Sequence, residues 1–137
     1  MMNILVLCTG NSCRSQMAEG FLGHYLKDRA KVHSAGIEAH GLNPRAVAVM
    51  KDVGIDISSH RSKTVDELEE DKFDHVLTVC DNAREHCPYF PATTSQLHHN
   101  FEDPSKVSGS EEEIMSAFRQ CRDAIDNYCR DLSDSIR

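Results

Sequence analysis

The first residues that could do chemistry lie in the stretch CTGNSCRS, residues 8–15, which follows a short apolar run. Cys8 supplies a nucleophilic sulfur, and Arg14 supplies a planar guanidinium that fits two oxygens of a tetrahedral anion. A loop between a buried strand and a helix can turn its backbone N–H groups inward, where they bind an anion and lower the pKa of a cysteine. The stretch therefore predicts an oxyanion site beside a reactive thiolate.

Several loop residues have a specific expected role. Gly10 permits a close approach or a positive φ, and Asn11 and Ser12 can hold the loop through side-chain hydrogen bonds to backbone. Ser15 can cap the following helix or donate to the Cys8 sulfur. The spacing alone also fits a buried cysteine before an ordinary polar loop, so the assignment depends on the position between strand and helix. The predicted oxyanion-binding residues are Thr9, Gly10, Asn11, Ser12, Cys13, Arg14 and Ser15.

A second pair of cysteines, Cys80 and Cys87, follows the apolar run at 75–79 and encloses a polar segment. If both apolar runs are strands of one parallel sheet, Cys8 and Cys80 lie at the same edge of that sheet. Thiols deliver two electrons by forming disulfides, so the pair favours redox chemistry. Buried apolar thiols, a zinc site with nearby histidines and a structural disulfide stay open as alternatives. The spacing typical of zinc ligands is missing, so we expect no metal.

A carboxyl group late in the chain is a candidate acid. Asp103 stands directly before Pro104. Such a group can protonate a leaving oxygen if its pKa is raised when the site closes. The same dipeptide also fits a simple turn, and the residues alone favour that turn.

The apolar pattern predicts strands that alternate with helices. Strands are expected at 3–7, 31–35, 75–79 and 96–99. Helices are expected at 15–28, 45–53 and 110–132, with a short capped helix at 64–68. This order predicts one α/β domain over residues 1–137, with an open parallel four-stranded sheet flanked by helices on both faces.

Composition limits the partners. The 137 residues include 15 Lys and Arg against 22 Asp and Glu, a formal net charge of −7, so we expect no nucleic-acid partner. The longest apolar run is too short to span a membrane, and no secretory signal is evident. We therefore expect a cytoplasmic monomer whose six cysteines stay reduced. Cys121 and Cys129 fit the apolar stripe of the last helix, and Cys13 receives no catalytic role.

The chain as a whole resembles the low-molecular-weight protein tyrosine phosphatases, and more closely their relatives, the thioredoxin-coupled arsenate reductases. The loop VLCTGNSCRS at 6–15 carries the resemblance first. It continues in order through MAE at 17–19, SAG at 34–36, GIDIS at 54–58 with His60, TVC at 78–80 and FEDP at 101–104. The resemblance thus covers nearly the whole chain.

The resemblance implies a nucleophile at Cys8, an oxyanion held by Arg14 and a general acid at Asp103. In a reductase of this kind, Cys8 attacks arsenate, and Cys80 then attacks the Cys8 sulfur and releases arsenite. Cys87 next forms a disulfide with Cys80, which reduced thioredoxin regenerates without a bound cofactor. A tyrosine phosphatase, which needs no second thiol, is the alternative, and a non-catalytic anion or metal sensor is a further one.

Some reductases of this type hold a potassium ion near the loop. The matching positions here include Asn11, Glu19 and Ser34, whereas an expected acidic position aligns with Lys63. A lysine ammonium can take the place of a monovalent cation. We therefore expect no potassium site and hypothesise a contact between Lys63 and Glu19. The resemblance gives no role to His60, His98 or His99.

Overall fold

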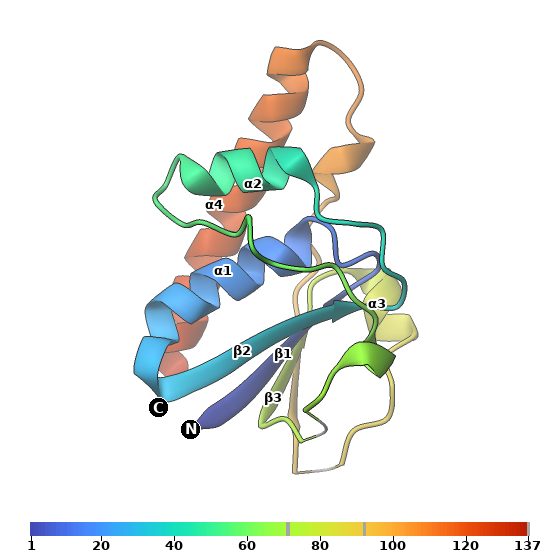
Figure 1. Ribbon diagram of the computed structural model, residues 1–137, viewed down its shortest axis with the longest axis vertical. Coiled ribbons are helices and arrows are strands. Elements are labelled where there is room, and N and C mark those ends of the chain that lie inside the picture. Colours follow the sequence, from blue (N-terminus) through green and yellow to red (C-terminus); the bar gives the residue numbers. More distant parts are fainter. Residues whose placement is uncertain (71, 92, 137) are drawn as a thin grey trace.

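The computed structural model describes residues 1–70, 72–91 and 93–136, and its centre is a parallel sheet in the order β2-β1-β3-β4 (Figure 1). The strands are β1 (Met2–Cys8), β2 (Ala30–Gly36), β3 (His75–Thr78) and β4 (Ser95–His98). β1 pairs with strands on both sides and is apolar on both faces, because only a covered sheet can bury such a run. The predicted parallel four-stranded sheet is confirmed.

Helices cover the two faces of the sheet unequally. The helices are α1 (Arg14–Leu26), α2 (Pro44–Lys51), α3 (Asp81–Glu85) and α4 (Glu111–Ser135), and the 3-10 helices are η1 (Lys27–Arg29), η2 (Val65–Glu67) and η3 (Pro104–Lys106). α1 and α4 lie side by side on one face, and α3 and η2 lie on the other (Figure 1). On that second face His33 of β2 meets Phe73 edge-on at 5.7 Å between ring centroids. Phe73 in turn meets Phe90 at 6.3 Å, so loop side chains provide much of this cover.

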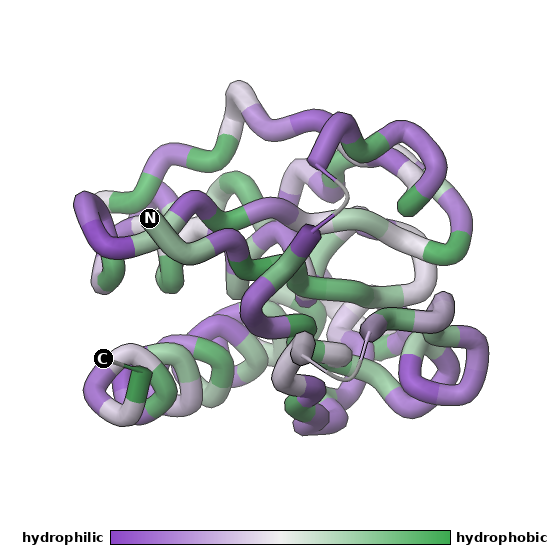
Figure 2. The backbone as a smooth tube through the Cα atoms, turned by 90° about the horizontal axis from the view of Figure 1, so that it is seen from below, coloured by the Kyte–Doolittle hydropathy of each residue, from purple (hydrophilic) through white to green (hydrophobic). Residues whose placement is uncertain are grey.

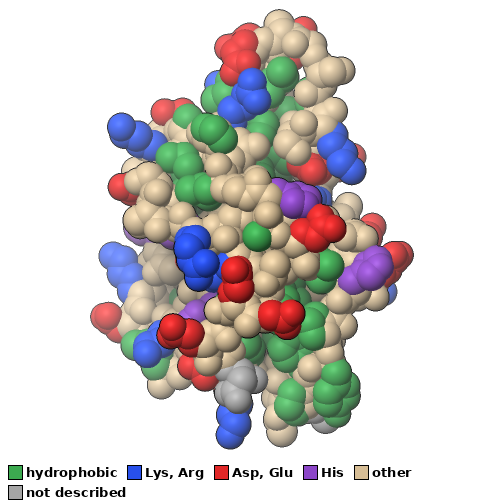
Figure 3. Space-filling view, turned by 45° about the vertical axis from the view of Figure 1, so that its right-hand side comes forward, with side chains coloured by type: hydrophobic (Ala, Val, Ile, Leu, Met, Phe, Trp, Pro, Cys, Tyr) green, Lys and Arg blue, Asp and Glu red, His purple; other side chains and the backbone are tan. Residues whose placement is uncertain are grey.

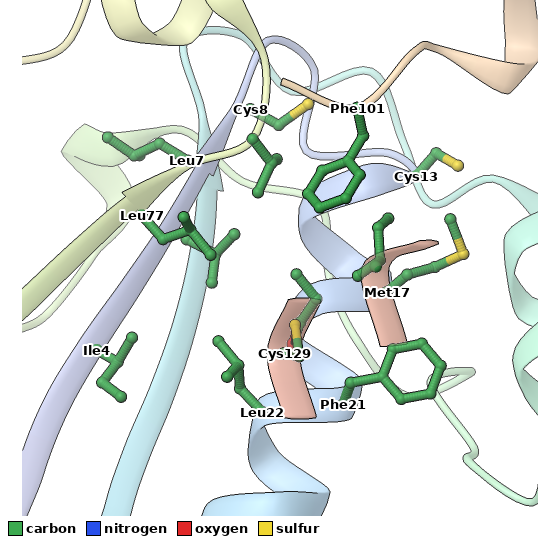
Figure 4. Packing of buried hydrophobic residues seen from close by; sticks show 14 of the residues in the cluster. Ile4, Leu7, Cys8, Cys13, Met17, Phe21, Leu22, Leu77, Phe101 and Cys129 are labelled. Carbon is green, nitrogen blue, oxygen red and sulfur yellow. The ribbon is translucent and has the colours of Figure 1, made fainter. Parts of the chain in front are cut away.

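The core lies between the sheet and the α1–α4 layer. Figure 2 shows hydrophobic residues along the inner strands and hydrophilic residues on the outer turns. In Figure 4, Met17 and Leu22 of α1 and Cys129 of α4 point into the space beside the sheet. All three side chains are fully buried, which fits the expected packing role of Cys129. This layer fixes the start of α1, and therefore the end of the loop that follows β1.

The local signals at two helix starts behaved as expected. Ser110 and Glu113 form a reciprocal capping box at the start of α4, and Thr64 and Glu67 form another at η2. The segment between Cys80 and Cys87 differs from the exposed loop that was expected. Residues 81–85 form the helix α3, because Cys80 is an extended N-cap residue whose sulfur accepts from the backbone N–H of Ala83.

Candidate active site

The loop between β1 and α1 forms one wall of a cavity of about 480 Å³. Cys8 is the last residue of β1, and Arg14 is the first residue of α1, so the sheet and the α1–α4 layer fix the two ends of this anion loop, residues 8–15. Residues from the loop and from two other segments line the cavity: Cys8, Thr9, Gly10, Ser12, Cys13, Arg14, His40, Asp103, Ser105 and Lys106. The structure thus brings five of the seven predicted oxyanion-binding residues to one cavity with Cys8.

Asn11 holds the loop from behind. It is fully buried with φ of 48°, the left-handed region that asparagine tolerates better than most residues. Its Nδ2 donates to Ser15 Oγ and Ser34 Oγ, both at 2.9 Å. Its Oδ1 accepts from Gln16 Nε2 at 3.0 Å and from the Lys63 backbone N–H at 2.9 Å. The amide has therefore used all four of its hydrogen-bonding positions.

Two details of the loop differ from expectation. The residue with positive φ is Asn11, whereas Gly10 serves a close approach: a Cβ there would lie 2.2 Å from His40 Nδ1. Ser15 does not cap α1, because the N-cap residue is Cys13 without a side-chain cap, and Ser15 instead accepts from Asn11. An oxyanion-binding role for Asn11 and Ser15 stays a prediction for their backbone N–H groups.

Arg14 lies between the cavity and the segment that carries Asp103. Its Nη1 donates to the Phe101 carbonyl at 2.9 Å, and its Nη2 lies 3.5 Å from Asp103 Oδ2. The other carboxylate oxygen of Asp103 accepts from the backbone N–H of Ser105 at 3.0 Å and from its hydroxyl at 2.6 Å. The predicted acid is thus an N-cap residue of η3 and also faces the cavity beside the guanidinium.

Cys80 lies directly beside Cys8. Both residues end neighbouring parallel strands, and a side-chain hydrogen bond joins their sulfurs. Thr9 Oγ1 lies 3.3 Å from Cys80 Sγ, and the backbone N–H of Ala83 donates to the same sulfur at 3.4 Å. The two cysteines are buried free thiols, so the second sulfur reaches the first without any motion of the sheet.

The two sulfurs share one negative charge. The hydrogen bond from Cys8, with further donors on Thr9 and Ala83, lowers the pKa of Cys80 to about 5. The same bond, together with burial, raises the pKa of Cys8, and this outweighs the opposing effects of Arg14 and the Thr9 N–H. The expectation of a lowered pKa at Cys8 is therefore wrong for this resting state. The pair titrates as a unit, with Cys80 holding the charge.

Cys87 lies apart from these two sulfurs. It is partly buried beyond the end of α3 and lines a separate cavity of about 380 Å³ with Thr78, Arg84 and His98. Burial raises its pKa. Seven helical residues would separate its Cα from that of Cys80 by about 10 Å, and a disulfide needs roughly 7 Å or less. A bond between Cys80 and Cys87 therefore requires α3 to unwind.

The histidine that the sequence left without a role supports the loop. His60 Nδ1 lies 3.0 Å from Gln16 Oε1, and its Nε2 lies 3.5 Å from Glu19 Oε2. Glu19 also accepts from the Ser34 hydroxyl at 2.6 Å, which links it to Asn11. The Lys63 ammonium donates to the Arg61 carbonyl at 3.1 Å, and no ion pair joins it to Glu19 in the described part of the chain. The GIDIS motif followed by His60 was the available signal.

The charge around the cavity is local. Arg14 and Lys106 line the cavity, although the whole chain carries −7. Figure 3 shows a face on which basic side chains are interspersed with acidic ones. Across residues 1–70, 72–91 and 93–136, no group of three or more His, Cys, Asp and Glu side chains could hold a metal ion. In the same ranges, no helix has the length and apolarity needed to cross a membrane.

These features define a thiol protein of the parallel α/β class with a cavity for an oxyanion. The chain belongs to the low molecular weight phosphotyrosine protein phosphatase family, whose model matches residues 3–137. The arsenate reductase of Bacillus subtilis (strain 168) is 48% identical over 132 residues, which cover 96% of this chain and 95% of that protein.

Two solved structures show the same similarity. An arsenate reductase in the phosphate-binding state has a TM-score of 0.81 and 30% identity over the whole of both chains. A thioredoxin-dependent arsenate reductase from Corynebacterium glutamicum has a TM-score of 0.77 and 25% identity, and the match covers 99% of this chain and 62% of that one. The resemblance seen in the sequence is confirmed.

Proposed function

We propose that this protein reduces arsenate to arsenite through a relay of Cys8, Cys80 and Cys87, with thioredoxin as the reductant. The observation that carries the proposal is the hydrogen-bonded pair of Cys8 and Cys80 at an oxyanion cavity. A phosphatase needs one reactive sulfur, whereas a reductase needs a second sulfur close to the first. The 48% identical relative named arsenate reductase supports this choice.

In the first step, arsenate occupies the cavity with its oxygens toward Arg14 and the loop N–H groups. The proton that Cys8 shares with Cys80 moves to Cys80, so that Cys8 attacks as a thiolate. A sulfur–arsenic bond forms, and one hydroxyl leaves arsenic as water with a proton from Asp103. Arsenic stays in the +5 state in the resulting adduct.

In the second step, Cys80 loses its proton and attacks the Cys8 sulfur. The sulfur–arsenic bond breaks, and its electron pair stays on arsenic, which leaves as arsenite in the +3 state. The two sulfurs are oxidised to a Cys8–Cys80 disulfide, so the electrons balance. The donors that surround Cys80, Thr9 and the Ala83 N–H, favour the thiolate that this step requires.

In the third step, α3 unwinds and Cys87 attacks the Cys80 sulfur as a thiolate. Cys8 leaves as a thiolate, and a Cys80–Cys87 disulfide remains. The segment between these cysteines is mostly exposed, so the disulfide can reach the dithiol of a protein reductant. We assign that role to thioredoxin because a solved structure of the same fold belongs to a thioredoxin-dependent arsenate reductase.

Hydrolysis of phosphotyrosine is the competing function, since Cys8, Arg14 and Asp103 would suffice for it. Such an enzyme must also bind an aromatic ring beside the phosphate. None of the described residues that line the cavity is Phe, Tyr or Trp. This composition fits a small inorganic oxyanion better than an aryl ester.

The deciding experiment is arsenate-dependent oxidation of NADPH in the presence of thioredoxin and thioredoxin reductase. Wild type should turn over, and Cys8→Ser, Cys80→Ser and Cys87→Ser should each abolish turnover. Cys121→Ser is the matched control, because this buried thiol is outside the relay and should leave the rate unchanged. Full activity in Cys87→Ser would reject the three-step relay, and phosphotyrosine turnover undiminished by Cys80→Ser, without arsenate turnover, would favour the phosphatase.

A further inference from the structure

The hydroxyl of Thr9 has two partners on the segment that carries the second nucleophile. Asn82 Nδ2 donates to Thr9 Oγ1 at 3.0 Å, and Thr9 Oγ1 lies 3.3 Å from Cys80 Sγ. An amide nitrogen only donates, so the Thr9 oxygen is the acceptor in the first contact. Its single proton is then free to point along the second contact. The network therefore fixes the direction of the bond: Thr9 donates to Cys80.

We propose that Asn82 is a positioning residue that aims the Thr9 hydroxyl proton at the Cys80 sulfur while α3 is folded. Asn82 is in the first turn of α3, and the Ala83 N–H of the same turn also donates to that sulfur. Two of the donors to Cys80 thus come from, or are oriented by, α3. The inference deepens the proposed function, because it names the residue that prepares the second nucleophile.

This arrangement would time the relay. Cys80 must be a thiolate for the second step, when α3 is folded and both donors are in place. In the third step Cys80 is one sulfur of a disulfide and needs no stabilisation as an anion. Unwinding of α3 then removes Asn82 and Ala83 from the site and frees Cys87 to attack. One helix therefore serves first to hold the thiolate and then, by its loss, to let the disulfide form.

Other charged groups near Cys80 must be held constant in any test. Cys8 of β1 and Arg14 of α1 act directly on its titration. Asp81, Glu102, Asp103 and Lys106 line a cavity with it. Burial raises the pKa of the three thiols outside the relay, which keeps them protonated at neutral pH: Cys13, Cys121 and Cys129.

The test titrates Cys80 by its thiolate absorbance near 240 nm in the full chain carrying Cys8→Ser and Cys87→Ser. The serine at position 8 can still donate a hydrogen bond but does not titrate in this range. Asn82→Leu should raise the pKa of Cys80 by about 1, a tenfold loss of thiolate at a pH between the two values. Asn82→Asp should raise it further, because a carboxylate accepts the Thr9 proton and adds a negative charge.

Two comparisons separate this role from a structural one. Asn100→Asp adds the same charge in the same cavity but keeps its acceptor for the Asp81 N–H, so it should raise the pKa less than Asn82→Asp. In a Thr9→Val background, Asn82→Leu should have almost no further effect. An equal rise with Thr9 present or absent, or no rise from Asn82→Leu, would overturn the proposal.

The titration needs neither arsenate nor thioredoxin, so its outcome is independent of the reductase assay. A protein that titrates as expected but turns over no arsenate keeps the assignment of Asn82 and loses the proposed function. In the active enzyme, a single turnover adds a second readout. Asn82→Leu should slow Cys8–Cys80 disulfide formation about tenfold at pH 6 and much less at pH 9, a pH profile that general loss of stability would not produce.

Discussion

The anion loop and the segment at 80–87 meet at one pair of sulfurs, yet they are built differently. The loop is held by buried groups, above all by Asn11, whose amide makes four hydrogen bonds. The segment is held by contacts at the surface: His98 Nε2 to Asp81 Oδ1 at 2.8 Å and Asn100 Oδ1 to the Asp81 N–H at 3.0 Å. Buried polar networks are rigid, whereas exposed contacts break at low cost.

This difference matches the chemistry that each region would perform. An oxyanion must meet donors already in place, because reorganising them during the reaction raises the barrier. A disulfide relay instead needs a segment that changes conformation, since Cys87 cannot reach Cys80 across a folded α3. The molecule thus separates a fixed binding wall from a releasable carrier. Each prediction below tests one side of that separation.

The largest effect is expected from Asn11→Ala. The substitution leaves the Ser34 hydroxyl, the Gln16 amide and the Lys63 N–H without their buried partner and puts alanine at a positive φ. We expect a loss of about 4 kcal/mol in the free energy of unfolding, measured by urea denaturation. Asn100→Ala, the same change at the exposed anchor of α3, should cost less than about 1 kcal/mol. Equal losses would remove the contrast between the two regions.

The next effect concerns the proton donor. Asp103→Asn keeps the shape of the side chain and its acceptor for the Ser105 N–H but removes the transferable proton. The rate of the arsenate step should fall about 100-fold, with a much smaller change in KM. Rapid-quench measurement of adduct or arsenite formation would test this. A fall in binding alone would instead assign Asp103 to holding Arg14, from which it lies 3.5 Å.

Sequence reasoning predicted the fixed region better than the releasable one. The apolar runs at 4–7 and 75–79 can be buried only in a covered sheet, so the strand order and the meeting of Cys8 with Cys80 followed from pattern. The helix α3 was missed because its five residues have no apolar period to reveal it. Its formation depends on a cap from the Cys80 sulfur, which only the tertiary structure supplies.

The distribution of charge between the sulfurs was also beyond the sequence. A loop of N–H groups predicts a lowered pKa at Cys8, but a second thiol within hydrogen-bonding distance moves the charge to Cys80. The support of the loop by His60 required knowledge of contacts across more than forty residues, from His60 to Gln16 and Glu19. Pairwise contacts of this kind have no local signature.

The shared thiolate predicts how stability depends on pH. With the pKa of Cys80 at about 5 in the folded state and an ordinary value of 9, the folded state binds fewer protons between these values. Stability should therefore rise with pH across this window, by at most about 1.4 kcal/mol per pH unit, and this gain is lost as pH falls through 5. Above pH 9 the raised pKa of Cys8 reverses the sign.

The measurement is urea denaturation of wild type and Cys80→Ser from pH 5 to 9. Carboxylates and histidines titrate in both proteins and cancel to first order in the difference. The wild-type curve should gain on the variant as pH rises. Parallel curves would mean that the sulfurs carry no charge in this range, and that the fixed loop does not extend its influence to Cys80.

The smallest effect is expected where α3 is fastened at the surface. His98 Nδ1 lies 2.7 Å from Thr78 Oγ1, and its Nε2 lies 2.8 Å from Asp81 Oδ1, so the imidazole joins the sheet to the first turn of α3. His98→Leu removes both contacts at a side chain that is 21% exposed. Surface pairs contribute about 0.2–1 kcal/mol, so Cys80–Cys87 disulfide formation should accelerate only a few-fold, with faster hydrogen exchange in α3. Slower disulfide formation would mean that His98 guides the moving segment rather than restraining it, because loss of a restraint can only favour the unwound state.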